Sequence, residues 1–462
     1  MGVRLLSAWI FRASDAIWGA FPTPFGDVPG PLVLALFAVG LYLTIRLRAI
    51  QVTHFGAALR LAVRQPASGA RGVLTPFQAF MTALAASIGT GNIAGVATAV
   101  VSGGPGAVFW IWCYGFFATS IKFTEAVLGI SFRVARGDAV SAGPMYYLRD
   151  GLGSRTLAWI YALLAGISAL TTAPFTQPNS MAVVLNSQFA VPTWVSGVTI
   201  AVLTWLVVIG GITSIGRAAE KLTPIKVGLY LSAGLFVILT HAGQLPTVFG
   251  MIFRDAFSLK AATGGAAGVG MMVALRYGLA RGVYANEAGY GTAAVVYGTA
   301  RSDRPAEQGL NAVLEVFVVS FVTSSISALT ILVSGVWSSG LTSTAVVAQA
   351  FNTAIPTAGG WIVTFCAVLF GYTTLIGWAY YGEQFFEYIF GTRVARPYRW
   401  IYCALVIPGA MLRVETVWAW GDLTNGLQIV PNLFGIVGLS SLVVRVSRNL
   451  TTISDFRSQI SD

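Results

Sequence analysis

Charged residues, histidines and cysteines are scarce in this chain. Lys, Arg, Asp and Glu make up 10% of its 462 residues, whereas about 25% is usual for soluble proteins. The two histidines, His54 and His241, lie in or near predicted loops, and the three cysteines lie in apolar segments without paired spacing. This pattern supports neither a metal centre nor a histidine-based catalytic dyad. No constellation of acid, base and orienting partner indicates a membrane-embedded enzyme, and no cofactor is predicted.

Hydrophobic residues account for 56% of the chain, and the mean hydropathy is +0.74. These values predict a polytopic protein whose main partner is the lipid bilayer. The net charge of +11 does not indicate a nucleic-acid partner, because Lys and Arg lie in short loops and not along one stripe. A sensor or receptor is not favoured, because no signalling domain is recognisable in the sequence. The composition leaves the oligomeric state open.

About eleven spanning helices are predicted, so the expected fold class is an all-α membrane protein. Residues 1–30 suggest an amphipathic helix followed by a Pro/Gly connector, and the first span runs from about residue 31 to 47. A bilayer core needs roughly 20 apolar residues per helix. On that basis the other spans lie near residues 75–101, 106–131, 156–187, 193–213, 224–245, 264–298, 308–336, 359–390, 399–418 and 424–445.

Basic residues cluster in the loops that follow odd-numbered spans, such as Arg46 after the first and Arg133 after the third. The opposite loops carry few, namely Arg254, Lys260 and Arg413. By the positive-inside rule, the N-terminus is expected outside and the C-terminal tail in the cytoplasm. The expected location is the inner membrane of a bacterium.

The stretch AASIGTGNIAG, residues 85–95, interrupts an apolar segment with glycines and polar side chains. Each glycine costs a helix about 1 kcal/mol relative to alanine. Ser, Thr and Asn side chains also compete for backbone hydrogen bonds. The pattern predicts a helix that breaks halfway, and unwound backbone is tolerated in a membrane only inside protein or along a water-filled cavity.

A second glycine-rich stretch, AATGGAAGVGMM at residues 261–272, lies in the later half of the chain. If the first span is set aside, ten helices remain, in two halves of five with opposite orientation. Paired broken helices at matching places in inverted halves point to a substrate site at the membrane midplane. Packing of helices through small residues is the alternative.

The chain resembles the alanine or glycine:cation symporter family, also called sodium:alanine symporters. The resemblance rests on the order and spacing of SIGTGNIAGVA (87–97), GGPGAVFWIW (103–112), AGPMYYL (142–148), GGITSI (210–215), ARGVYANEAGYGTA (280–293), TTLIGWAYYGE (373–383) and IVPNLFG (429–435). It implies sodium-coupled uptake of a small neutral amino acid by a carrier with an inverted five-helix repeat and one extra N-terminal helix. The expected division is 1–30, 31–72 for the extra helix, 73–245 and 246–445 for the repeats, and 446–462 for the tail.

The expected substrate site lies at the first break. A half-helix that begins there directs its positive N-terminal end at a carboxylate, so Thr90, Gly91 and Asn92 are candidates. Thr374 and Trp378 share one helix face, and the resemblance implies that Trp378 walls the pocket. The other substrate candidates are Gln177, which the resemblance implies, and Gly265 and Gly268 in the second glycine-rich stretch.

Sodium prefers hard oxygen ligands, which unwound carbonyls and hydroxyl groups supply. The expected sodium site joins the backbone near Ala85, Ala86 and Gly89 to the hydroxyls of Thr373 and Thr374.

Intramembrane acids are candidates for function. Glu125 follows Lys122 by three residues, so an ion pair competes with a coupling role. Glu287 and Glu383 are expected near cytoplasmic ends as gate or packing groups, and Arg281 or Arg276 is the expected partner of Glu287.

Three departures from the family pattern concern the coupling ion and the substrate. Val319-Ser320 stands where the family has an Asp-Thr pair, which removes an intramembrane carboxylate. Ala173-Pro174 replaces a Gly-Asn pair, and Ala285 replaces a serine before Asn286. A carrier driven by protons, or one for another zwitterionic solute, therefore stays an alternative, with Glu125 and Ser320 as further candidates.

Overall fold

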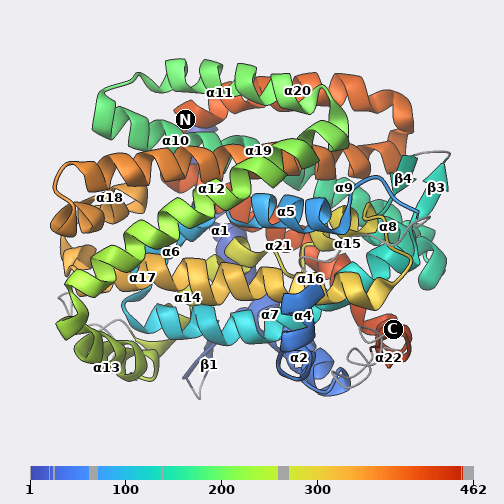
Figure 1. The fold of residues 1–462 in the computed structure, drawn as a ribbon, viewed down its shortest axis with the longest axis horizontal. Coiled ribbons are helices and arrows are strands. Elements are labelled where there is room, and N and C mark those ends of the chain that lie inside the picture. Colours follow the sequence, from blue (N-terminus) through green and yellow to red (C-terminus); the bar gives the residue numbers. More distant parts are fainter. Residues whose placement is uncertain are drawn as a thin grey trace, which may run out of the picture.

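The computed structural model describes residues 2–19, 21–23, 26–61, 71–136, 139–258, 270–448 and 450. The fold is almost entirely helical, and long helices cross it side by side (Figure 1). The α-helices are α1 Gly2–Trp18, α2 Pro31–Arg46, α3 Ile50–Thr53, α4 Phe55–Leu61, α5 Pro76–Ser87, α6 Ala94–Gly103, α7 Gly106–Ser131, α8 Pro144–Tyr146, α9 Arg155–Thr171, α10 Ala173–Phe189, α11 Thr193–Val208, α12 Gly211–Thr240, α13 Leu245–Ala256, α14 Met271–Asn286, α15 Thr292–Gly298, α16 Pro305–Val316, α17 Ser324–Val333, α18 Ser343–Ala354, α19 Ala358–Phe390, α20 Ala395–Met411, α21 Val414–Gly438 and α22 Ser440–Ser447.

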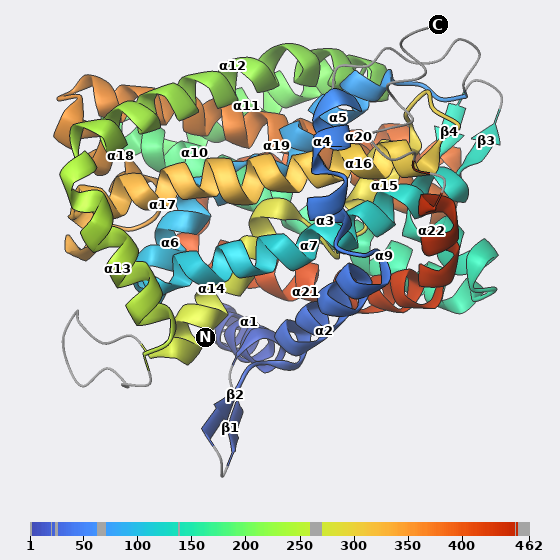
Figure 2. The same cartoon turned by 60° about the horizontal axis from the view of Figure 1, so that its bottom comes forward.

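Short irregular helices and two hairpins complete the described part of the chain. The 3₁₀ turns are η1 Thr90–Asn92, η3 Ala242–Gln244, η5 Val336–Ser338 and η6 Thr392–Val394, and the π-helical segments are η2 Tyr147–Gly151 and η4 Phe317–Thr323. The strands are β1 Phe21–Thr23 with β2 Gly26–Val28, and β3 Val134–Arg136 with β4 Ala139–Ser141. The predicted Pro/Gly connector therefore contains a hairpin, which projects from the bundle beside α1 (Figure 2).

Four helical stretches among the described residues are long and apolar enough to cross a membrane, and two bent pairs raise the number to six. One bent pair is the predicted broken helix, in which α5 and the η1–α6 segment meet at 56°. The chain is thus a multi-pass helical membrane protein. The count of eleven spans and the inverted repeat stay predictions.

Helix α5 begins where the sequence provides a capping box. The backbone N–H of Gln78 donates to the Thr75 hydroxyl at 3.0 Å, and the N–H of Thr75 donates to the Gln78 side chain at 3.1 Å. Pro76 at the first helical position loses no hydrogen bond there. This fixed start places the carbonyl end of α5 inside the bundle, between α12 and α19.

Helix α12 is longer than predicted. The sequence placed one span at 193–213 and the next at 224–245, but α11 ends at Val208 and α12 runs from Gly211 to Thr240. The turn lies at Gly210 and Gly211, where Gly211 has a φ of +66° that favours glycine. Pro224 lies inside α12 instead of starting it. Lys226 consequently sits near the middle of a 30-residue helix.

Candidate functional site

The break after α5 frees carbonyl groups that a continuous helix would use. Gly89 is extended, with φ −110° and ψ −164°, and its N–H bonds to Ser87 O instead of reaching back four residues. The hydroxyl of Thr374, from α19, donates to Ala86 O at 2.7 Å and Ala85 O at 3.1 Å. The predicted unwinding is confirmed, and it joins α5 to α19 through these carbonyls.

Gln177, on α10, bridges to the same break. Its Oε1 atom accepts from the Thr90 backbone N–H at 3.0 Å and from the Thr90 hydroxyl at 2.9 Å. Both the backbone N–H and the hydroxyl of Thr90 therefore donate to Gln177. Asn92 points elsewhere, because its Nδ2 atom donates to Ser324 Oγ at 3.3 Å and to Val319 O at 3.4 Å.

A largely enclosed cavity lies beside this break, and it is about as large as one water molecule. It is bounded by Ala86, Ser87, Gly89, Gly91, Thr172, Ala173, Gln177, Tyr284, Glu287, Tyr290, Thr374, Trp378 and Asn425. Four predicted substrate residues, Gly91, Gln177, Thr374 and Trp378, are thus brought together. Thr90 and Asn92 do not line it.

The structure describes a second unwound segment, but the glycine-rich stretch predicted to break lies largely outside the described residues. Residues 259–269, with Gly265 and Gly268, lie outside the described residues. Gly270 caps the start of α14, which continues unbroken to Asn286. The chain then unwinds from Glu287 to Gly291 before α15, and Glu287 has a left-handed φ of 57°.

Glu287 lines the cavity, and the predicted pairing of its carboxylate with Arg281 or Arg276 is wrong. Its carboxylate accepts from Trp378 Nε1 at 2.6 Å and from the Thr292 hydroxyl at 2.8 Å. Arg281 pairs with Asp422, and Arg276 pairs with Asp15. Glu287 misses these arginines because both side chains leave α14 toward α21 and α1.

Glu125 clamps the second break. Its Oε1 atom accepts from the backbone N–H groups of Gly289 at 2.9 Å and Gly291 at 3.0 Å, and from Asn432 Nδ2 at 2.8 Å. The loop thereby gains partners for backbone groups that no helix satisfies.

Lys122 does not pair with Glu125, so the ion-pair alternative for Glu125 is wrong. The Nζ atom of Lys122 lies 2.6 Å from Glu315 Oε1 on α16 and 2.5 Å from Asn286 O. Both charged side chains are buried, and Glu315 also accepts from Ser87 and Tyr297. Lys122 thus pairs with Glu315 from the neighbouring helix α16 and not with Glu125, which lies three positions away on its own helix.

Lys226 is the functional candidate that the sequence reasoning missed. Its Nζ atom donates to Ile88 O at 2.6 Å, to Ala85 O at 3.3 Å and to the Thr373 hydroxyl. Ala85 and Thr373 belong to the predicted sodium site. The available signal was a lysine within an apolar run, since ionisable residues inside a membrane are functional candidates by default.

Arg281 and Asp422 form a largely buried ion pair near the cavity wall residue Tyr284. The two side chains are 6% and 13% exposed, and the guanidinium lies 4.8 Å from the centre of the Trp418 ring. Tyr284 packs against Trp418 at 4.9 Å, and its hydroxyl lies 2.5 Å from Thr176 Oγ1. Tyr284 lines the cavity, so this Arg281–Asp422 layer packs next to the cavity through Trp418 and Tyr284.

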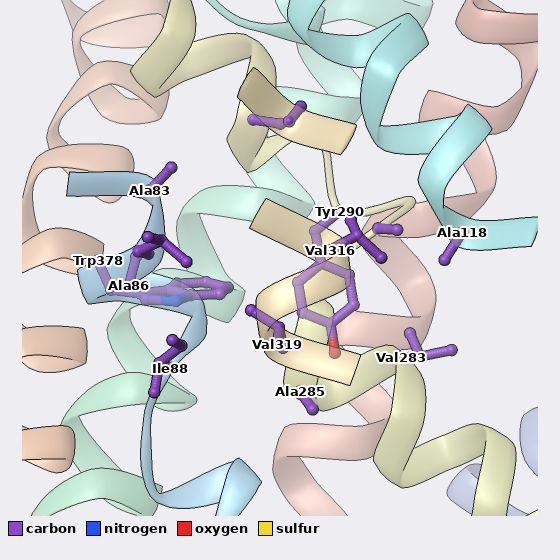
Figure 3. Close-up of a cluster of buried hydrophobic side chains, with 14 of the residues drawn as sticks. Ala83, Ala86, Ile88, Ala118, Val283, Ala285, Tyr290, Val316, Val319 and Trp378 are labelled. Atoms are coloured by element: carbon purple, nitrogen blue, oxygen red, sulfur yellow. The ribbon is translucent and has the colours of Figure 1, made fainter. Parts of the chain in front are cut away.

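Val319, at the position where the resemblance implies a carboxylate, is an apolar packing residue. It is fully buried within an apolar cluster that includes Ala86, Trp378 and Ala285 (Figure 3). Ser320 beside it accepts from Asn286 Nδ2 at 3.2 Å. Ser320 thus ties η4 to the end of α14 and does not line the cavity.

Comparison with known proteins agrees with this picture. The model of the sodium:alanine symporter family matches residues 25–459. A sodium/alanine symporter of Methanococcus maripaludis is 38% identical over 92% of this chain and 95% of its own. A probable sodium/glutamine symporter of Bacillus subtilis is 30% identical over 97% and 91%.

Solved transporter structures share the fold. The Eremococcus coleocola manganese transporter aligns with a TM-score of 0.54 at 14% identity, covering 83% of this chain and 89% of that one. A sodium-coupled sialic acid symporter aligns with a TM-score of 0.50 at 11% identity, covering 90% and 95%.

Proposed function

Because the chain belongs to the sodium:alanine symporter family, we propose that it takes up a small neutral amino acid, such as alanine or glycine, by alternating access. The family consists of secondary transporters, so the chain is a carrier and not an enzyme. The observation that carries the proposal is the cavity between two broken helices, which joins polar groups to aromatic walls.

The lining residues suit a zwitterion. The positive end of the half-helix after the first break, near Gly91, suits the substrate carboxylate. The Glu287 carboxylate, which faces the same cavity, suits the substrate ammonium group. Trp378 and Tyr290 pack edge to face at 6.1 Å and supply the apolar wall. Because the cavity is small, we expect the carrier to select amino acids with short side chains.

We further propose the architecture that the family resemblance implies. It has about eleven spans, with an extra helix at residues 31–72 and inverted repeats at 73–245 and 246–445. The N-terminus lies outside a bacterial inner membrane and the tail at 446–462 lies in the cytoplasm. The breaks at Gly89 and at Glu287–Gly291 support this pairing of halves.

Sodium is the coupling ion that the family implies. A proton-coupled or otherwise repurposed carrier of another zwitterionic solute is the second candidate. The observation that favours it is Lys226, whose ammonium group is bonded to oxygens of the expected sodium site.

Uptake of a panel of radiolabelled amino acids by proteoliposomes tests the proposal. We expect saturable uptake of at least one small neutral amino acid, and counterflow when unlabelled substrate is inside. A panel that gives neither uptake nor thermal stabilisation of the purified protein contradicts the proposed function, since any ligand of the folded state raises apparent stability.

A further inference from the structure

The carbonyl end of α5 and one face of α19 form a cage of oxygen atoms around the Lys226 ammonium group, and we propose that this tethered cation takes the place of a coupling sodium ion there. Substrate binding and transport then need no sodium at this cage. The inference rests on the proposed transport function and identifies the residue that sets its ion requirement.

The three donors of the ammonium group match three acceptors. These are Ile88 O at 2.6 Å, Ala85 O at 3.3 Å and the Thr373 hydroxyl oxygen, whose own hydrogen goes to Phe370 O at 3.1 Å. The lysine thus has no donor left over. Each of these oxygens is unavailable to a metal ion while the ammonium group stays in place.

The cage holds a positive charge without a carboxylate. Among the described residues, no Asp or Glu oxygen lies within 4.0 Å of Lys226 Nζ. The compensating groups are the negative end of helix α5 and the face of Phe370, whose ring centre is 5.1 Å away. Uncharged oxygens at the C-terminal end of a half-helix are the ligands that carriers use for sodium. A second cation beside the ammonium group is repelled.

Lys122 provides the contrast within the same chain. It also reaches the carbonyl end of a half-helix, at Asn286 O, but its charge is neutralised by Glu315 at 2.6 Å. Glu315 makes that lysine part of a buried ion pair. Among the described residues, Lys226 has no carboxylate partner. Its ammonium group therefore lies at the predicted sodium site without a neutralising negative charge.

The cage and the cavity share a wall. Thr374 donates to Ala85 O and Ala86 O, and both Ala86 and Thr374 line the cavity. A cation in the cage therefore fixes the carbonyls that shape the substrate site. In a sodium carrier this fixation depends on ion binding, whereas Lys226 supplies it without a bound ion.

The test compares wild-type protein with Lys226→Met, which keeps most of the side-chain volume but removes the charge. Lys221→Ala, an exposed lysine on the same helix, is the matched control. Purified full-length proteins are assayed for uptake in sodium chloride and in choline chloride. Thermal stability is measured in both salts with and without alanine or glycine.

For the wild type and the Lys221→Ala control, we expect uptake within twofold in the two salts and no stabilisation by sodium alone. For Lys226→Met, we expect alanine affinity in choline to fall at least tenfold and sodium to restore it. A wild-type protein that loses more than tenfold of its uptake without sodium, or that sodium alone stabilises, overturns the inference. If Lys226→Met does not fold, the wild-type sodium measurements still decide. Failure of the proposed function looks different, because no amino acid is then bound or carried in either salt.

Discussion

The Nζ atom of Lys226 lies 2.6 Å from the carbonyl oxygen of Ile88, the residue that caps the end of helix α5. This bond links the middle of α12 to the break around which the site is built. The break is thus held from three neighbouring helices, by Lys226, by Thr374 and by Gln177. Substitutions in these groups test the site.

Gln177→Ala should weaken substrate binding. The change leaves the N–H and hydroxyl of Thr90 without their shared acceptor, and an unsatisfied buried donor costs about 1–3 kcal/mol. We expect the KM for the transported amino acid to rise roughly tenfold, in line with that cost. Gln177→Glu keeps an acceptor oxygen and serves as the comparison. A wild-type KM for Gln177→Ala contradicts the assigned role.

Trp378→Phe should impair transport more than it impairs folding. The phenyl ring keeps the apolar wall, but the bond to Glu287 at 2.6 Å is lost. We expect a lower kcat/KM with a melting temperature close to that of the wild type. Trp361→Phe, at an exposed position of the same helix, is the control and should behave as the wild type. If the Trp378→Phe and Trp361→Phe variants were equally active, Trp378 would not be a substrate-site residue.

Asp422→Asn should loosen the Arg281–Asp422 layer and make the cavity more accessible. The ion pair with Arg281 is largely buried, so removing one charge leaves the other uncompensated and favours states in which the two side chains separate. The measurement is the rate at which a thiol reagent labels Ala173→Cys in a background without the native cysteines. We expect faster labelling with Asp422→Asn.

Glu415→Gln is the control for this experiment, because its ion pair with Arg413 is exposed and 3.8 Å long. Surface pairs of this kind contribute little to stability. An unchanged labelling rate in Asp422→Asn, or an equal increase in Glu415→Gln, would show that the buried pair does not close the cavity.

Glu125→Ala should destabilise the second break, whereas Glu125→Gln should be tolerated. Glutamine retains an oxygen that accepts from Gly289 and Gly291, but alanine leaves both N–H groups unpaired. Each orphaned group costs about 1–3 kcal/mol. Thermal unfolding in detergent measures the difference. Loss of transport in a stable Glu125→Gln variant would instead indicate that the charge itself is used.

Lys122→Met should unfold more readily than the double variant Lys122→Met with Glu315→Gln. Breaking a buried ion pair from one side typically costs about 3–5 kcal/mol, because the remaining charge has no partner. The double change removes both charges and keeps an acceptor for Tyr297. Thermal unfolding of both single variants and the double variant gives the coupling, and additive losses would contradict a direct interaction.

The first break and its partners were largely predictable from sequence. Glycines and polar residues at 85–95 predict unwinding from local propensity alone. The family resemblance supplied Gln177 and the roles of Thr374 and Trp378, and helical periodicity places the last two on one helix face. All three line the cavity with Gly91. Local rules sufficed because the residues that cause the break also form the site.

The second break was not predictable in the same way. The prediction concerned the glycine-rich stretch at 261–272, most of which lies outside the described residues, and it did not include the unwound segment at Glu287–Gly291. Partners far away in the sequence hold that loop, namely Glu125 on α7 and Asn432 on α21. Pairwise contacts of this range leave no periodic trace in a single sequence.

Lys226 escaped notice for a geometric reason. The predicted span began at about residue 224, which places Lys226 in the first turn of a helix. Helix α12 instead begins at Gly211 and carries the lysine into the middle of the bundle. An error of about three helical turns in one boundary therefore concealed the residue on which the ion requirement depends.

Because the Lys226 ammonium group is covalently part of helix α12, it also affects how much charge crosses the membrane in each transport cycle. Each sodium ion that crosses with a zwitterion moves one positive charge down the membrane voltage, which is worth about 2.3 kcal/mol per 100 mV. Lys226 never leaves the protein, so its cage adds no current to the transport cycle. Uptake that is coupled to no other ion should then be far less sensitive to membrane voltage than uptake by a carrier that binds sodium there.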